Sequence, residues 1–84
     1  MQRLYFYTKE NCGLCEEAKT IVELLQAMHH FEIIEIDIYK EEKYLEKYQL
    51  MIPVIEIDNQ VVAYGNISYE SIEQKLKAGK NSEK

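Results

Sequence analysis

The chain has 84 residues and carries 10 Lys and Arg against 15 Asp and Glu, which gives a formal net charge of -5. Apolar residues make up 46% of the sequence, a fraction typical of one small globular domain and too high for a disordered chain. The acidic balance and the lack of a basic stripe argue against binding to nucleic acid. No apolar run approaches the roughly 18 residues of a membrane span, and the N-terminal run is too short for a signal peptide, so we expect a cytoplasmic protein.

The first half of the chain predicts a strand, a helix and a second strand. Residues 4–7 are continuously apolar, which indicates a strand buried on both faces in the centre of a sheet. Apolar residues at positions 14, 18, 21, 22, 25 and 28 form one helical face, and Asn11 or Cys12 is expected at the N-cap. Over residues 31–38, isoleucines alternate with acidic residues, as in an edge strand with one buried face.

The second half predicts a short helix, a hairpin and a last helix. Residues 40–49 form a charged helix with a narrow apolar stripe. A strand follows over residues 54–57, and the pair Asp58-Asn59 turns the chain into a fourth strand over 61–64. Ser68 is expected to cap the last helix and Gly79 to end it.

The resulting order, β-α-β-α-β-β-α, predicts an α/β protein. The first β-α-β unit requires parallel strands with a right-handed crossover, whereas the closing hairpin is antiparallel. We therefore expect a mixed four-stranded sheet with helices on both faces. One domain should occupy residues 1–79, followed by a polar C-terminal tail over residues 80–84.

The two cysteines, Cys12 and Cys15, stand where the first strand gives way to the first helix. Residues three apart at the start of a helix lie on the same side, so the two sulfur atoms can reach disulfide distance. The unpaired N–H groups and partial positive charge of the helix N-terminus favour a thiolate over a thiol. Cys12 is nearest these donors and more exposed, so we predict that it is the nucleophile and that Cys15 is the resolving thiol.

Other interpretations of this cysteine pair exist. An intrachain zinc site with His29 and His30 is disfavoured, because a helix of about 14 residues at ~1.5 Å per residue separates the imidazoles from the thiols by roughly 20 Å. The histidines are expected to cap the end of that helix. A metal or iron–sulfur carrier that shares cysteines between two chains, a non-enzymatic redox sensor and an inert buried pair all stay open. No metal ligand is assigned within one chain.

Two segments resemble the signatures of a known family. Residues 7–15, YTKENCGLC, resemble the active-site segment of glutaredoxins. Residues 51–58, MIPVIEID, resemble their second signature, in which the proline is cis. Over about residues 3–78 the order of elements is similar to that of the glutaredoxin-like branch of the thioredoxin superfamily. The resemblance therefore implies a thioredoxin-like fold of the glutaredoxin type.

The resemblance also implies roles for substrate-binding residues. It implies that Cys12 and Pro53 meet in space, and that the backbone of Ile52 hydrogen-bonds an incoming peptide or thiol. It further implies that Lys9 meets a substrate carboxylate. Gly65 matches one of the two glycines that precede an acidic, glutathione-holding residue in glutaredoxins, but the second glycine and the acidic residue are missing. The co-substrate therefore stays open between glutathione, another low-molecular-weight thiol and a protein.

Taken together, the patterns predict a glutaredoxin-like dithiol oxidoreductase that reduces disulfides in proteins or in low-molecular-weight compounds. No organic cofactor is needed, because the dithiol itself carries two electrons. The expected partners are disulfide-bearing substrates and a separate reductant, with neither nucleic acid nor membrane involved. Because no long apolar surface stripe is left over, we expect a monomer.

Overall fold

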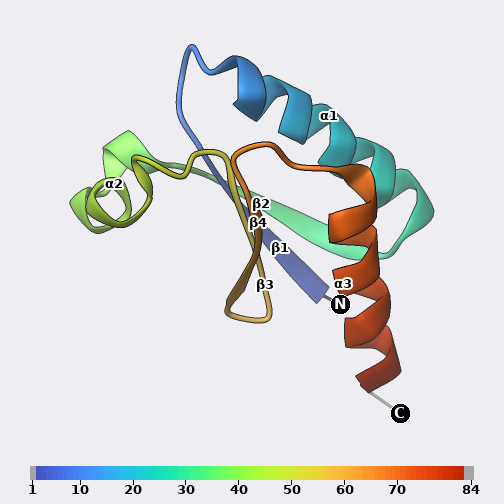
Figure 1. The fold of residues 1–84 in the computed structure, drawn as a ribbon. Helices are drawn as coiled ribbons and strands as arrows, with labels where there is room; N and C mark the ends of the chain where they lie inside the picture. The colour runs from blue at the N-terminus through green and yellow to red at the C-terminus, as the bar shows by residue number, and fades with distance from the viewer. Residues whose placement is uncertain (1, 83–84) are drawn as a thin grey trace.

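The computed structural model describes residues 2–82, and the side chains of residues 2–76. Its elements follow the predicted order (Figure 1). The strands are β1 (Gln2–Thr8), β2 (Phe31–Asp37), β3 (Val54–Ile57) and β4 (Gln60–Tyr64); the helices are α1 (Gly13–Met28), α2 (Glu42–Tyr48), α3 (Tyr69–Ser82) and a short 3-10 helix, η1 (Ile38–Lys40). In the described part of the chain, no helix has the length and apolar composition that crossing a membrane requires.

The strands form one mixed sheet in the order β2-β1-β3-β4. β1 pairs in parallel with β2 and antiparallel with β3, and β3 pairs antiparallel with β4. β1 is therefore the central strand, and its continuously apolar run is explained by hydrophobic packing against both of its faces. β2 lies at an edge of the sheet, as its alternating pattern predicts. The predicted α/β class and mixed four-stranded sheet are confirmed.

The strand directions bring several loops to one end of the sheet. At this end, Thr8 of β1 lies opposite Asp37 of β2. Tyr7 pairs with Val54 at the start of β3, and Val54 pairs in turn with Tyr64 at the end of β4. The turn between β3 and β4 lies at the opposite end (Figure 1). The segment that carries the cysteines and the segment that carries the proline therefore meet at the same end of the sheet.

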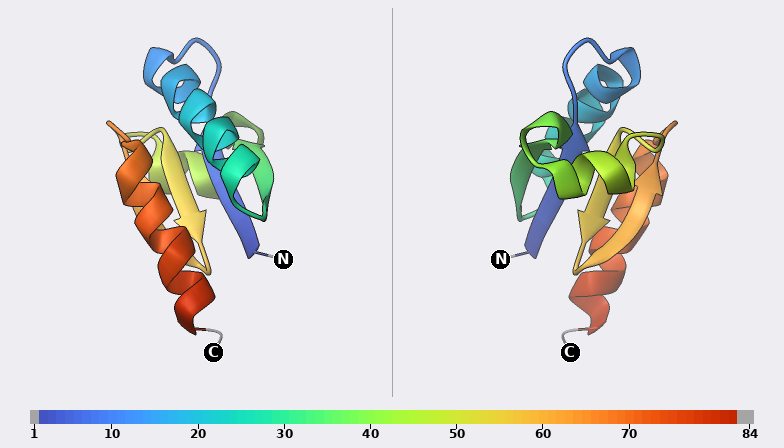
Figure 2. Two further views of the ribbon diagram at one scale, coloured as in Figure 1. Left: turned by 90° about the vertical axis from the view of Figure 1, so that its right-hand side faces the viewer. Right: turned by 90° about the vertical axis from the view of Figure 1, so that its left-hand side faces the viewer.

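Helices α1 and α3 cover one face of the sheet, and α2 covers the other (Figure 2). Side chains of a strand alternate between the two faces, so two hydrophobic clusters form. In β1, Leu4 and Phe6 belong to the cluster under α1 and α3, whereas Tyr5 and Tyr7 belong to the cluster under α2. Buried members of the larger cluster are Leu4, Phe6, Cys15, Ala18, Val22, Leu25, Phe31, Ile55, Ile57, Ile67, Ile72 and Leu76. Those of the smaller cluster are Tyr7, Ile38, Tyr48 and Val54.

The buried face of α1 differs from the predicted one. Its buried residues are Cys15, Ala18, Val22 and Leu25. Leu14 and Met28, which the predicted apolar face includes, are exposed at 45% and 74%. Leu14 precedes Cys15 by one residue and is therefore rotated by about 100° away from the sheet. Met28 is the last residue of the helix and lies outside the buried cluster.

Three predicted element boundaries are wrong. The predicted second strand ends at Ile38 and the next helix begins at Lys40, but both residues belong to η1. The Asp37 carboxylate causes this tight turn, because its Oδ1 accepts a hydrogen bond of 2.9 Å from the Tyr39 N–H. Gly79 does not end the last helix, since α3 continues to Ser82 and includes residues 80–82 of the predicted tail. Residues 83–84 of that tail lie outside the described residues.

Local turn and capping chemistry follows the sequence closely. Asp58 and Asn59 both have positive φ angles, 53° and 62°, as a two-residue hairpin turn of type I′ requires. The Ser71 N–H donates to Ser68 Oγ at 3.3 Å, so Ser68 caps α3 as predicted. These contacts fix where the hairpin reverses and where the last helix begins.

Leu25 and Leu24 are neighbours on α1 and form a matched pair for testing burial, since Leu25 is 0% exposed and Leu24 is 57% exposed. We expect Leu25→Ala to lower the free energy of unfolding by about 2–5 kcal/mol, because it removes buried methyl groups and leaves a cavity. Leu24→Ala should change it by less than about 0.5 kcal/mol. Denaturant-induced unfolding measures both values, and equal losses would contradict this orientation of α1.

Candidate active site

Cys12 and Cys15 form a disulfide at the first turn of α1, with their Cα atoms 5.2 Å apart. Cys12 is the N-cap residue, and its sulfur accepts a hydrogen bond of 3.2 Å from the Cys15 N–H. The preceding residue, Asn11, has a φ angle of 55°, a left-handed conformation that asparagine tolerates better than most residues. The loop therefore turns sharply into the helix and leaves the Cys12 sulfur beside backbone donors that stabilise negative charge.

The two cysteines differ in exposure. Cys15 is only 3% exposed and belongs to the buried cluster under α1, whereas Cys12 is half-buried and packs against the edge of that cluster. A partner molecule can therefore approach the Cys12 sulfur more easily than the Cys15 sulfur. This difference in exposure agrees with the sequence-based expectation.

The proline segment forms a short loop at the same end of the sheet. The Ile52–Pro53 peptide bond is cis, as the resemblance implies. Gly65, with a φ angle of 71°, donates its N–H to the carbonyl oxygens of Met51 at 3.0 Å and Pro53 at 2.8 Å. Pro53 is fully buried, while Ile52 is half-buried and contacts both hydrophobic clusters. Ile52 and Cys12 thus both pack against the cluster under α1.

A cleft of about 750 Å³ lies beside the disulfide, between the start of α1 and the end of β2. Both cysteines line it together with Lys9, but Ile52, Pro53 and Gly65 do not. The predicted site residues therefore fall into two groups. Lys9 lines the cleft beside the disulfide, whereas the proline loop and Gly65 are not part of that lining.

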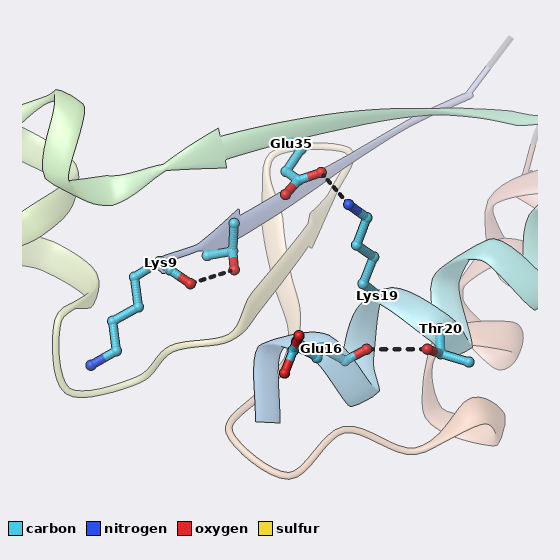
Figure 3. Close-up of polar contacts among 6 residues, drawn as sticks. Lys9, Glu16, Lys19, Thr20 and Glu35 are labelled. Atoms are coloured by element: carbon cyan, nitrogen blue, oxygen red, sulfur yellow. Dashed lines mark hydrogen bonds and ion pairs between the residues drawn. The ribbon is translucent and has the colours of Figure 1, made fainter. Parts of the chain in front are cut away.

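Charged side chains of both signs line this cleft. Lys19 on α1 and Glu35 on β2 form an ion pair at 3.4 Å that spans it, while the Lys9 side chain extends away from that pair (Figure 3). The ion pair is about half exposed to solvent, so its contribution to stability is small. Lys40, Glu10, Glu16 and Asp37 complete the charged lining. The cleft is therefore polar and offers no single dominant charge.

Several lining residues were not predicted from the sequence. Lys19 follows Cys15 by four positions, so helical periodicity alone places both on one side of α1. Glu35 and Asp37 on β2 could not be located without the register that pairs Thr8 with Asp37. The sequence alone could therefore have identified Lys19 as a neighbour of Cys15, but it could not have identified Glu35 and Asp37.

The histidines lie far along α1 from the cysteines in sequence and have other contacts. His29 is the C-cap of α1, as predicted, and its N–H donates to the Leu25 carbonyl at 2.9 Å. Its ring Nε2 lies 3.1 Å from Glu73 Oε2 on α3. His30 is exposed. Among residues 2–82, no cluster of three or more His, Cys, Asp or Glu side chains is arranged to hold a metal ion.

A polar network lies under α2, next to the active-site loops. The Tyr7 hydroxyl donates to Glu56 Oε1 at 3.0 Å, and the Tyr48 hydroxyl donates to Glu56 Oε2 at 3.3 Å. Burial raises the pKa of the Tyr7 hydroxyl, and the hydrogen bond to Glu56 and the charge of that carboxylate raise this pKa further. The Tyr7 ring also packs against the rings of Tyr44 and Tyr48, with centroids 5.1 and 4.7 Å away.

The mixed sheet between helices, the Cys-x-x-Cys disulfide at a helix start and the cis-proline at the same end of the sheet define a protein of the thioredoxin superfamily. Within that superfamily the match is more specific. Residues 3–77 match the glutaredoxin-like domain family DUF836, and the chain belongs to that family.

Solved structures share this fold. A protein of Nitrosomonas europaea solved by NMR superposes with a TM-score of 0.78 at 26% identity, over 89% of this chain and 91% of its own. A crystal structure from X. campestris gives a TM-score of 0.73 at 20% identity, over 89% and 96% of the two chains. A mutant thioredoxin of Halobacterium salinarum gives 0.69 at 18% identity, over 92% of this chain and 73% of the thioredoxin. The thioredoxin-like fold is thereby established.

The raised pKa of Tyr7 predicts a loss of stability at high pH. The folded state holds the hydroxyl proton more tightly than the unfolded chain, so this stabilisation is complete below about pH 10 and decreases as the pH rises further. Between pH 9 and 11, wild type should lose up to about 1 kcal/mol more unfolding free energy than Tyr7→Phe. Tyr39→Phe, which changes an exposed tyrosine, should behave as wild type. Identical pH slopes for wild type and Tyr7→Phe in urea unfolding would contradict the assigned burial effect.

Proposed function

We propose that the protein is a thiol–disulfide oxidoreductase that uses Cys12 and Cys15 to reduce disulfides in proteins or in low-molecular-weight compounds. The observation that carries this proposal is the disulfide at the start of α1, where the half-buried Cys12 sulfur accepts the Cys15 N–H. That position favours a thiolate on Cys12 when the pair is reduced. Membership of the glutaredoxin-like family supports the same activity.

The reaction balances with the two cysteines alone. The Cys12 thiolate attacks one sulfur of the substrate disulfide, forms a mixed disulfide and releases the first substrate thiolate. Cys15 then loses its proton and attacks the Cys12 sulfur, which releases the second substrate thiolate and forms the Cys12–Cys15 disulfide. The substrate gains two electrons and the cysteine pair loses two. A separate thiol reductant, either glutathione, another small thiol or a protein, must then reduce the pair again.

The loop around the cis-proline is proposed to hold the substrate. Within residues 2–82, neither the N–H nor the C=O of Ile52 has a hydrogen-bond partner, so both are available to an extended peptide or thiol. Pro53 is buried directly beside Ile52 and fixes the conformation of the loop that presents these groups. Gly65 holds the loop closed, because its N–H is already shared between two loop carbonyls. Lys9, on the cleft side of Cys12, would meet a substrate carboxylate.

Serine variants separate the roles of the two cysteines. Cys12→Ser should abolish the reduction of insulin and of small disulfides, because the remaining thiol, Cys15, is buried and cannot reach a substrate disulfide. Cys15→Ser should form the mixed disulfide but fail to resolve it, so a covalent adduct accumulates and is released by dithiothreitol. Turnover rates and intact-mass measurements check both expectations. Full activity of Cys12→Ser would show that the assigned nucleophile is wrong.

The redox equilibrium of the pair tests whether it works as a dithiol. We expect a single two-electron transition in thiol/disulfide buffers between about -270 and -200 mV, with a mass loss of about 2 Da on oxidation and no adduct. Alkylation of the quenched protein followed by mass spectrometry measures this transition. A pair that stays reduced throughout would contradict the dithiol mechanism, and slow exchange with every tested disulfide would favour the redox-sensor alternative. Metal bound to anaerobically purified protein, detected by elemental analysis and visible absorption, would favour a carrier that shares cysteines between chains.

A further inference from the structure

Glu56 receives two hydrogen bonds from buried tyrosines. It lies on β3 and is half-buried, between Tyr7 of β1 and Tyr48 of α2, whose side chains are 3% and 1% exposed. Each of its carboxylate oxygens accepts one tyrosine hydroxyl, at 3.0 Å from Tyr7 and at 3.3 Å from Tyr48. One side chain therefore joins the central strand, a second strand and the helix on the other side of the protein from α1.

From Tyr48, a chain of hydrogen bonds continues into the proline loop. The Tyr48 carbonyl accepts the Met51 N–H at 2.9 Å, and the Met51 carbonyl accepts the Gly65 N–H at 3.0 Å. The same Gly65 N–H also donates to the Pro53 carbonyl at 2.8 Å. Direct hydrogen bonds thus link the position of Tyr48 to that of the cis-proline loop.

From Tyr7, the connection to the cysteine loop runs along the backbone of β1. Tyr7 is followed by Thr8, the last residue of β1, and then by the loop that leads to Cys12. Rings of Tyr44 and Tyr48 pack against Tyr7 at centroid distances of 5.1 and 4.7 Å, so its side chain is held on two sides. Glu56 therefore fixes the end of β1 relative to the end of α2.

We propose that Glu56 is a positioning residue that holds the Ile52–Pro53 loop in place relative to the Cys12 loop, an inference that rests on the proposed disulfide reduction. Glu56 acts through Tyr7 and Tyr48, and it is not one of the residues that line the cleft beside the disulfide. Removing its carboxylate leaves the two buried tyrosine hydroxyls without an acceptor. A buried donor that lacks a hydrogen-bond partner lowers the stability of the folded state. The proline loop then loses the anchor that the Tyr48 side chain provides through Glu56, while the cysteine pair keeps its helix N-terminus.

The test compares Glu56→Leu, Glu56→Gln and Glu73→Leu in the reduction of insulin by the full chain. Glu56→Leu should raise KM at least fivefold and leave kcat within twofold of wild type, because the Ile52 backbone proposed to bind substrate is displaced but the nucleophile is not. Glu56→Gln should recover wild-type KM within twofold, since an amide can accept from one hydroxyl and donate to the other. Glu73→Leu is the matched control, because it removes a half-buried carboxylate bound to His29 on the opposite face. It should leave KM unchanged.

Hydrogen exchange provides a readout that does not depend on activity. In Glu56→Leu, the amides of Met51 and Gly65 should exchange at least tenfold faster, while the amide of Val22 in α1 keeps its wild-type rate. Unchanged exchange at Met51 and Gly65, or an unchanged KM in an active protein, overturns the positioning role. Equal KM increases in Glu56→Leu and Glu73→Leu overturn it as well. A wild-type chain that reduces no disulfide instead overturns the proposed function, and with it this inference.

Discussion

The pairing of β1 on both of its edges is the constraint on which the rest of the structure depends. Helices α1 and α3 cover one face of this central strand and α2 covers the other, so both faces are buried, which explains its continuous apolar run. Its parallel partner can be reached only through a crossover, so α1 must begin directly after β1. Its antiparallel partner, β3, must begin at the end where β1 stops. Cys12 and the cis-proline loop are therefore brought together by strand direction, although 41 positions of sequence separate Cys12 from Pro53.

The proline loop and the cleft beside the disulfide have different physical character. Among residues 2–82 the backbone N–H and C=O of the half-buried Ile52 have no hydrogen-bond partner, and its side chain packs against both hydrophobic clusters. The cleft is lined by lysines and carboxylates, two of which neutralise each other in the Lys19–Glu35 pair. Backbone groups recognise the shape of an extended chain, whereas exposed charges act weakly and are screened by salt.

The sequence predicted those features that depend on local chemistry. The apolar run of β1, the Asp58-Asn59 turn, the Ser68 cap and the cysteine pair at a helix start all follow from the residues themselves. Features that depend on distant partners were missed. At the start of α1, Cys15 packs against the sheet, whereas the prediction placed its neighbour Leu14 on the buried face. The contacts of Glu56 require β1, β3 and α2 to be placed together, and no local pattern signals them.

The short spacing of Cys12 and Cys15 has a consequence for the entropy of the unfolded chain. A disulfide restricts the unfolded ensemble less when it closes a shorter loop. Here the sequence separation is 3 residues, so chain entropy stabilises the oxidised protein by only about 2 kcal/mol, against about 4.7 kcal/mol for a loop of roughly 100 residues. Most of the folding free energy must therefore come from the two hydrophobic clusters. The stability of the fold accordingly depends little on this disulfide.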